Sequence, residues 1–196
     1  DAGFNVLLVD QRSHGKSEGK LITFGVKERY DAVSWANYCV DKIDKNAEIV
    51  LGGISMGATT VLLASGLNLP PNVKGIIADC GFTSPTAIIK KVARQAFRIN
   101  AGFFLPVMDI LCRITGHFGI YGVSTEKALA KTRLPVLFIH GKNDNFVPCE
   151  MSGIGYKSAA GEKEILLIDG ADHGMSYLID TKRVEEHLLR FLQKIS

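Results

Sequence analysis

The sequence is short of cysteine, of long apolar runs and of any large charge excess, and each shortage excludes a class of protein. Its four cysteines are widely separated and form no CxxC pair, so we expect neither a zinc site nor a dithiol redox motif. No apolar run approaches the roughly 18 residues of a membrane-spanning helix. A net charge of +3 over 196 residues is too mild and too dispersed to predict nucleic-acid binding. With 46% hydrophobic residues, the composition instead predicts one globular domain over residues 1–196.

The isolated cysteines also bear on the compartment. They are typical of buried free thiols in a reducing environment, which predicts a cytoplasmic protein. The first residues show no signal peptide, although a leader or membrane anchor before Asp1 would lie outside this sequence.

Five short, strongly apolar runs rich in β-branched residues alternate with longer helical patterns. The runs cover residues 6–10, 49–55, 75–80, 136–141 and 165–169. Near-continuous hydrophobicity is typical of strands that are covered on both faces. Helical spacing is found over residues 26–43, 57–66 and 182–195. We therefore predict an α/β fold with a mostly parallel sheet of about five strands flanked by helices.

One long stretch, residues 82–134, interrupts this alternation. It contains no strand candidate but two apolar helical patterns, the second of which includes Phe103, Phe104 and Met108. An insertion of this length after the carboxyl end of a strand is often a lid or binding cap. Additional packing on the sheet explains the pattern equally well. If it is a lid, we expect these three side chains to bind an apolar part of a substrate.

The strongest local pattern is Gly53-Ile54-Ser55-Met56-Gly57, where a predicted strand ends and a helix rich in small residues begins. In this context GxSxG indicates a nucleophilic serine in a tight, strained turn, with flanking glycines that relieve steric clash. The helix N-terminus and the backbone N–H of Met56 are placed to form an oxyanion hole. The alternative is a glycine-rich turn in which the serine is incidental.

A serine hydroxyl needs a base, and the chain has five histidines. His173 follows the last predicted strand directly, at the end of the sheet where open parallel sheets carry their active sites. The other four have separate explanations: His187 lies within the C-terminal helix, His117 in the insertion, His140 at the end of a buried strand and His14 in a turn. We predict His173 as the base; a solvent-exposed loop histidine is the alternative.

The base in turn needs a carboxylate to orient it. Asp144 follows the penultimate predicted strand and so belongs to the same end of the sheet. Asp79, at the end of the run 75–80, is the rival. Asp172 adjoins the base in sequence and points poorly for this role. We predict Asp144 as the orienting acid.

These motifs together resemble the α/β-hydrolase superfamily. The resemblance rests on GISMG at Ser55, GKND at Asp144 and ADHG at His173, in the chain order of that superfamily. The segment DQRSHGKSEG at 10–19 is similar to its D-x-R-G-H-G-x-S-x-G segment, with serine where the first glycine is usual. With CGFTSP at 80–85, the chain resembles bacterial esterases related to prolyl-oligopeptidase-like hydrolases.

The resemblance implies earlier strands that this sequence does not contain. Members of the superfamily normally have three strands and a helix before the segment that opens this chain, and a loop among them usually supplies a second oxyanion donor. We therefore expect an N-terminally truncated domain with unpaired strand edges at 6–10 and 49–53, which favour self-association. Loss of one oxyanion donor typically lowers the rate on the order of 10²–10³-fold, so we expect impaired activity of this chain alone.

The implied function is that of a serine hydrolase that needs neither a metal nor an organic cofactor. The apolar insertion favours a small-molecule carboxylic ester with an apolar group as substrate. A peptide or a thioester is the alternative within enzymes. A catalytically silent binding module of the same fold is the alternative outside them.

Overall fold

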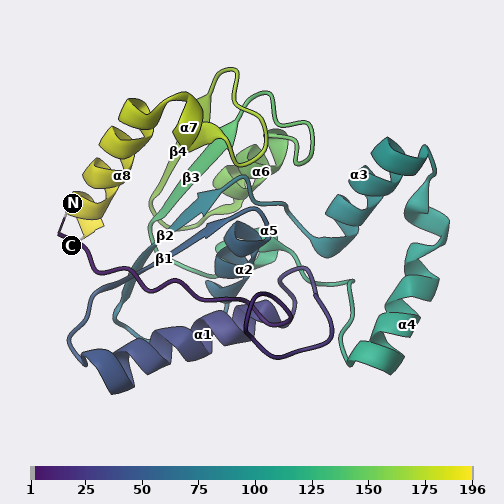
Figure 1. Cartoon of the computed structure of the whole chain (residues 1–196), viewed down its shortest axis with the longest axis horizontal. Coiled ribbons are helices and arrows are strands. Elements are labelled where there is room, and N and C mark those ends of the chain that lie inside the picture. Colours follow the sequence, from purple (N-terminus) through teal and green to yellow (C-terminus); the bar gives the residue numbers. More distant parts are fainter. Residues whose placement is uncertain (1–2, 196) are drawn as a thin grey trace.

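The computed structural model describes residues 3–195, which form a parallel sheet with helices on both faces (Figure 1). The strands are β1 (Ile49–Ile54), β2 (Val73–Asp79), β3 (Val136–Gly141) and β4 (Lys163–Ile168). Their order across the sheet is β1-β2-β3-β4, and all three pairings are parallel. The predicted α/β class is confirmed, with four strands in the described part of the chain.

The helices follow the sequence pattern closely. Those before β3 are α1 (Glu28–Tyr38), which continues into a π-helical turn (Cys39–Ile43), α2 (Met56–Ala64), α3 (Pro85–Phe97), a 3₁₀ turn (Ala101–Phe103), α4 (Leu105–Gly116) and α5 (Thr125–Leu129). Those after it are α6 (Glu150–Ser158), α7 (Ser176–Ile179) and α8 (Thr181–Ile195). The helices predicted over 26–43, 57–66 and 182–195 are therefore present, with small shifts at their ends.

Strand β3 is the centre of the core because both of its faces are buried. Val136 and Phe138 point into a cluster formed with α2, α5 and the end of α6. Leu137 and Ile139 point to the opposite face, where they pack with β4 and α8. This alternation follows from the two-residue period of a strand, and it explains the uninterrupted hydrophobic run.

The expectation of a strand over residues 6–10 is wrong. This segment has no strand assignment, and its apolar side chains are exposed, with Val6 at 76% and Leu8 at 90%. A β-branched run becomes a strand only when a neighbour pairs with its backbone groups. Among the described residues, β1 forms its strand pairing with β2, and the segment 6–10 passes by without joining the sheet.

Helices α3 and α4 form a hairpin that stands to one side of the sheet, with its turn at the far end (Figure 1). Hydrogen bonds hold its base in place. Thr59 Oγ1, on α2, accepts from the backbone N–H of Phe82 at 2.9 Å and donates to the Phe82 carbonyl at 3.1 Å. On the returning side, the backbone N–H of Thr125 donates to the carbonyl of Thr83 at 2.9 Å. The stretch 82–134 holds helices α3, α4 and α5, as its apolar helical patterns predicted, and its role as a lid stays a prediction.

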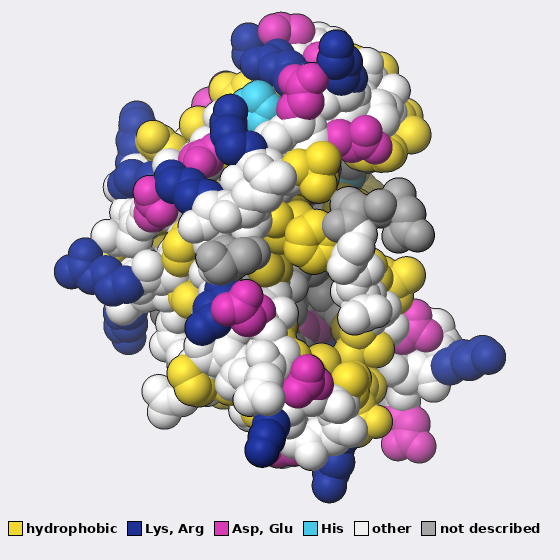
Figure 2. Space-filling view, turned by 90° about the vertical axis from the view of Figure 1, so that its left-hand side faces the viewer, with side chains coloured by type: hydrophobic (Ala, Val, Ile, Leu, Met, Phe, Trp, Pro, Cys, Tyr) yellow, Lys and Arg dark blue, Asp and Glu magenta, His cyan; other side chains and the backbone are white. Residues whose placement is uncertain are grey.

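The surface on the α8 side is mixed in character. Figure 2 shows charged side chains of both signs scattered over that face, with hydrophobic side chains gathered around a hollow between them. In the described part of the chain, no helix combines the length and apolarity needed to cross a bilayer.

The four cysteines are free thiols, as predicted, but only Cys80 is fully buried.

Candidate active site

Ser55 lies at the sharp turn between β1 and α2, in a backbone conformation that non-glycine residues rarely adopt. Its φ of 56° and ψ of −116° are characteristic of a strained turn that projects the side chain out of the sheet. The turn is tight enough that a Cβ on Gly53 would lie 2.3 Å from the carbonyl carbon of Gly57, so glycine is required there. The Ser55 N–H donates to the carbonyl of Asp79 at 2.8 Å, which fixes the turn to β2.

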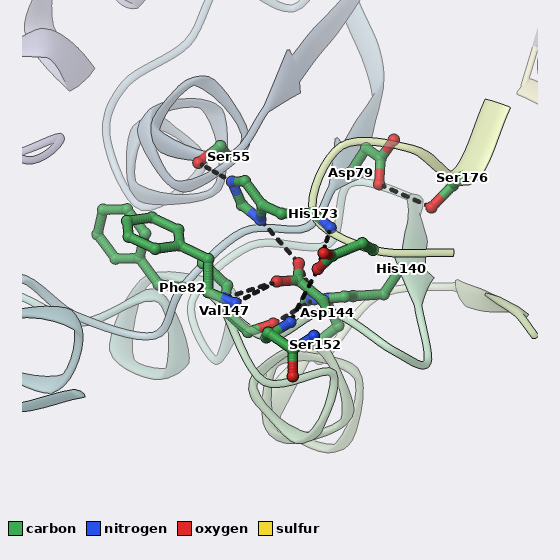
Figure 3. A network of polar contacts seen from close by, with 12 residues as sticks. Ser55, Asp79, Phe82, His140, Asp144, Val147, Ser152, His173 and Ser176 are labelled. Atoms are coloured by element: carbon green, nitrogen blue, oxygen red, sulfur yellow. Dashed lines mark hydrogen bonds and ion pairs between the residues drawn. The ribbon is translucent and has the colours of Figure 1, made fainter. Parts of the chain in front are cut away.

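His173, in the loop after β4, connects Ser55 to Asp144 (Figure 3). Its Nδ1 lies 2.7 Å from Oδ2 of Asp144, and its Nε2 lies 2.9 Å from Oγ of Ser55. A carboxylate only accepts hydrogen bonds, so Nδ1 carries the proton and Nε2 of the neutral ring is left to accept from the serine. This is the tautomer that a general base toward Ser55 requires.

Asp144 is buried, and both of its oxygens are occupied by donors. The backbone N–H groups of Phe146 and Val147 donate to Oδ1 at 2.9 and 2.7 Å. His140 Nε2 lies 3.2 Å from Oδ2, the same oxygen that accepts from His173. The carboxylate is thus held in one orientation.

His140 supports this carboxylate from the end of β3. Its Nε2 lies 2.9 Å from the carbonyl of Val147, which can only accept, so Nε2 is the donor. Nδ1 then accepts from the hydroxyl of Ser152 at 2.6 Å. Burial lowers the pKa of His140 and keeps the ring neutral. The sequence predicted a satisfied strand histidine here but missed its contact with Asp144, for which the four-residue spacing was the available signal.

Asp79, the rival acid, lies nearby at the end of β2 but does not bond His173. Its Oδ1 accepts from the hydroxyl of Ser176, on α7, at 3.4 Å (Figure 3). Burial raises the pKa of Asp79 to about 6, and the donor Ser176 and the nearby His173 oppose that shift only in part. Asp172 is directed away from the histidine ring, since its Oδ1 accepts from the backbone N–H groups of Asn145 and His173.

One group of side chains in this site has the composition of a metal site. The potential ligand atoms of Cys80, Asp144 and His173 lie within 4.8 Å of one another. Burial and the neighbouring carboxylates raise the pKa of Cys80 to about 12. A zinc ion would need this thiol as a thiolate. Two of the three side chains, Asp144 and His173, already form a hydrogen bond with each other. The chemistry of this group therefore favours a hydrogen-bonded site over a metal site.

Met56 is the first residue of α2, so its N–H has no intrahelical acceptor and is available to a ligand. A cavity of about 320 Å³ borders this turn and is lined by Ile54, Met56, Gly57 and residues 9–11 and 14. A larger cavity, of about 560 Å³, lies between residues 10–35 and Gly116 and is lined by neither Ser55 nor His173. Neither residue lines the smaller cavity either, but Ile54 and Met56, the two chain neighbours of Ser55, do, so the smaller cavity is the one that adjoins the turn.

The role of the hairpin side chains in substrate binding stays a prediction. Phe103 and Phe104 are exposed and Met108 is half-buried, and the interactions described for Ser55 and His173 involve none of them. The aromatic side chain that does contact the base is Phe146, whose ring packs edge-on against that of His173 with centroids 5.0 Å apart. Sequence reasoning missed Phe146 because an aromatic residue in a loop carries no motif.

The fold and this group of residues define an α/β-hydrolase. The Serine aminopeptidase, S33 family matches residues 1–112, more than half of the chain, and the chain belongs to that family. It is similar in structure to an esterase of Pyrococcus furiosus, with a TM-score of 0.73 and 23% identity over 99% of this chain and 72% of that one. A puromycin-hydrolyzing peptidase of Mycobacterium tuberculosis gives a TM-score of 0.68 and 22% identity over 88% of this chain and 26% of that one.

The relatives similar in sequence are longer than this chain. The protein YqkD of Bacillus subtilis is 30% identical over 196 residues, which are 100% of this chain and 64% of that protein. The protein YfhR of Escherichia coli K12 is 28% identical over 174 residues, or 88% of this chain and 54% of that protein. The function of both is uncharacterized. The chain thus spans somewhat over half of the curated relatives that it matches.

Proposed function

We propose that the protein is a serine hydrolase in which Ser55 is the nucleophile, His173 the general base and Asp144 the residue that orients the base. One observation carries this proposal: a continuous hydrogen-bonded chain runs from Ser55 Oγ through both ring nitrogens of His173 to the Asp144 carboxylate, at 2.9 and 2.7 Å. The three residues come from loops at the carboxyl ends of β1, β3 and β4. Three elements distant in sequence thus converge on one proton path.

The reaction proceeds by acyl transfer. Ser55 Oγ attacks the substrate carbonyl while its proton passes to Nε2 of His173, and the carbonyl oxygen becomes an oxyanion facing the N–H of Met56. The C–O bond to the leaving alcohol breaks as His173 returns the proton to it. Water then attacks the acyl-enzyme with His173 as base, and the acid is released as Ser55 regains its proton. Asp144 keeps Nδ1 protonated throughout.

A carboxylic ester with an apolar group is the substrate class that we favour. The structural likeness to the Pyrococcus furiosus esterase extends over nearly all of this chain, and the cavity beside Ser55 is lined in part by Val9, Ile54 and Met56. The likeness to a puromycin-hydrolyzing peptidase and membership of a family described as serine aminopeptidases favour the second candidate, an amide of an amino acid.

Labelling with a fluorophosphonate tests the nucleophile. The chain should be labelled, Ser55→Ala should lose the label, and Ser158→Ala, which changes a serine on α6 outside the site, should keep it. Equal labelling of Ser55→Ala would assign the reaction to another residue. No labelling of a longer version that includes the expected earlier strands would favour a catalytically silent module.

Relative rates then separate the two substrate classes. Matched aryl ester and aminoacyl aryl amide substrates should be compared by kcat/KM, and we expect the ester to be preferred. A preference for the amide would move the protein to the peptidase class while leaving the assignment of Ser55 intact.

A further inference from the structure

The α3–α4 hairpin exposes an unusual amount of apolar surface. On and beside α4 the exposed side chains are Phe103, Phe104, Val107, Ile110, Leu111 and Ile114. Phe97 and Ile99, at the end of α3, are exposed as well, and the two most exposed of these side chains are Phe103 at 84% and Phe97 at 70%. We call residues 97–104 the hairpin tip. Soluble monomers rarely expose a contiguous apolar patch of this kind unless it binds something.

The same hairpin carries a concentrated positive charge. Lys90 and Arg94 are exposed at four-residue spacing and so share one face of α3, and the exposed Arg98 follows directly after the helix, at its left-handed C-cap position. Lys91 adds a further cation. None of these four takes part in an ion pair within residues 3–195.

The charge of the hairpin exceeds that of the whole chain. Residues 85–116 hold five cations, the four above and Arg113, against one acid, Asp109, which gives +4; since the chain as a whole has +3, the remainder carries −1. That single acid is already occupied, because its carboxylate bonds Arg113 at 2.7 Å and the backbone N–H of Ile120 at 2.6 Å. The hairpin therefore presents uncompensated positive charge beside apolar side chains.

Apolar side chains next to uncompensated cations are complementary to an anionic interface. We propose that the hairpin tip docks on an anionic phospholipid surface, with its apolar side chains at the level of the headgroups and the α3 cations on the lipid phosphates. The tip lies at the end of a projecting hairpin and not in a groove, which suits insertion into an interface (Figure 1). Juxtaposed Lys and Arg residues add attraction to anionic lipid. Docking would place the protein at a membrane surface, and this proposal does not depend on the proposed hydrolase activity.

Co-sedimentation with vesicles tests the proposal. The 196-residue chain should bind vesicles in which phosphatidylglycerol replaces part of the phosphatidylcholine, and bind vesicles of phosphatidylcholine alone much more weakly. Lys90→Glu with Arg94→Glu should weaken binding by at least about tenfold. Phe97→Ser with Ile99→Ser should weaken it by a similar factor. Added salt should weaken the binding of the parent chain.

Matched variants on other parts of the surface serve as controls. Lys157→Glu with Lys182→Glu removes the same charge from α6 and α8, and Ile43→Ser with Leu189→Ser removes exposed apolar side chains away from the hairpin. Both should bind vesicles as the parent does. Equal loss in these controls would overturn the proposal, as would equal binding to both kinds of vesicle.

Gel filtration without lipid addresses the competing occupants. A dimer that Phe97→Ser with Ile99→Ser dissolves would assign the tip to a second copy of the chain and overturn lipid docking. A monomer that binds anionic vesicles through the tip supports the proposal. Fluorophosphonate labelling of each variant reports separately on Ser55, so that a failure of docking and a failure of the proposed hydrolase are distinguishable.

Discussion

The site at the carboxyl edge of the sheet differs from the α3–α4 hairpin in the burial and the partners of its side chains. At the site, the polar groups are buried and partnered: Asp144 accepts four donors, and His140 uses both ring nitrogens. On the hairpin, apolar groups are exposed, and the α3 cations lack ionic partners among the described residues. In the first region, hydrogen bonds within the fold fix the positions of the side chains. In the second, the exposed apolar side chains and the cations are free to contact another surface.

This difference in burial predicts which substitutions should lower the stability of the fold. Removing one member of a satisfied buried network leaves its partners unpaired, which costs more than the contact itself contributes. Removing an exposed apolar side chain changes the folded state little, because its surroundings are water before and after. The following predictions test this contrast, from the largest expected effect to the smallest.

Ser55→Ala and His173→Ala should each lower kcat for an activated ester by about 10³-fold or more. The double variant should lose little beyond either single one, because the two residues act as one unit. The measurement is steady-state hydrolysis, with thermal unfolding as a check on folding. Multiplicative losses in the double variant would show that the two side chains act independently.

Asp144→Ala should lower the free energy of unfolding by about 3 kcal/mol, since it leaves without an acceptor the buried N–H of Val147, the part-buried N–H of Phe146 and the ring N–H groups of two histidines. Asp144→Asn retains an acceptor and should unfold closer to the parent while still losing most activity, because it disturbs the tautomer of His173. Urea denaturation and ester hydrolysis measure the two effects. A fully stable Asp144→Ala would mean that water replaces the carboxylate.

Leu137→Ala should cost about 3 kcal/mol of stability, and Ile110→Ala less than about 0.5 kcal/mol. Leu137 is fully buried on β3, whereas Ile110 is 56% exposed on α4. Denaturation midpoints compare the two apolar truncations directly. A large loss for Ile110→Ala would reveal that the hairpin surface is covered in solution.

Asp79→Asn should stabilise the protein by about 2 kcal/mol at about pH 8 and by much less below about pH 4. The folded pKa of about 6 is raised above the ordinary 3.8, so ionisation of Asp79 opposes folding. Its cost grows as the pH rises from about 4 to about 6 and is fully present above that window. The difference in stability between variant and parent, followed against pH, measures it. A pH-independent difference would contradict the burial argument.

Much of this arrangement could be predicted from the sequence because it depends on local pattern and chain order. The strand–turn–helix around Ser55 and the loops at Asp144 and His173 carry motifs, and parallel strands bring such loops to one edge. The segment 6–10 could not be assigned correctly, since a strand depends on a partner that local pattern does not report. Likewise, Cys80 and Phe146 approach the site through tertiary packing, which leaves no periodic signal.

The hydrogen bonds between Thr59 and Phe82 give the base of the hairpin a mechanical role. Thr59 lies on the helix that begins immediately after Ser55, and Phe82 begins the segment that leads into α3. The base of the hairpin therefore cannot move independently of α2. Any displacement of the base must either break these hydrogen bonds or shift α2. A load applied at residues 97–104 would reach the nucleophile through the Thr59–Phe82 hydrogen bonds and the strained turn at Ser55.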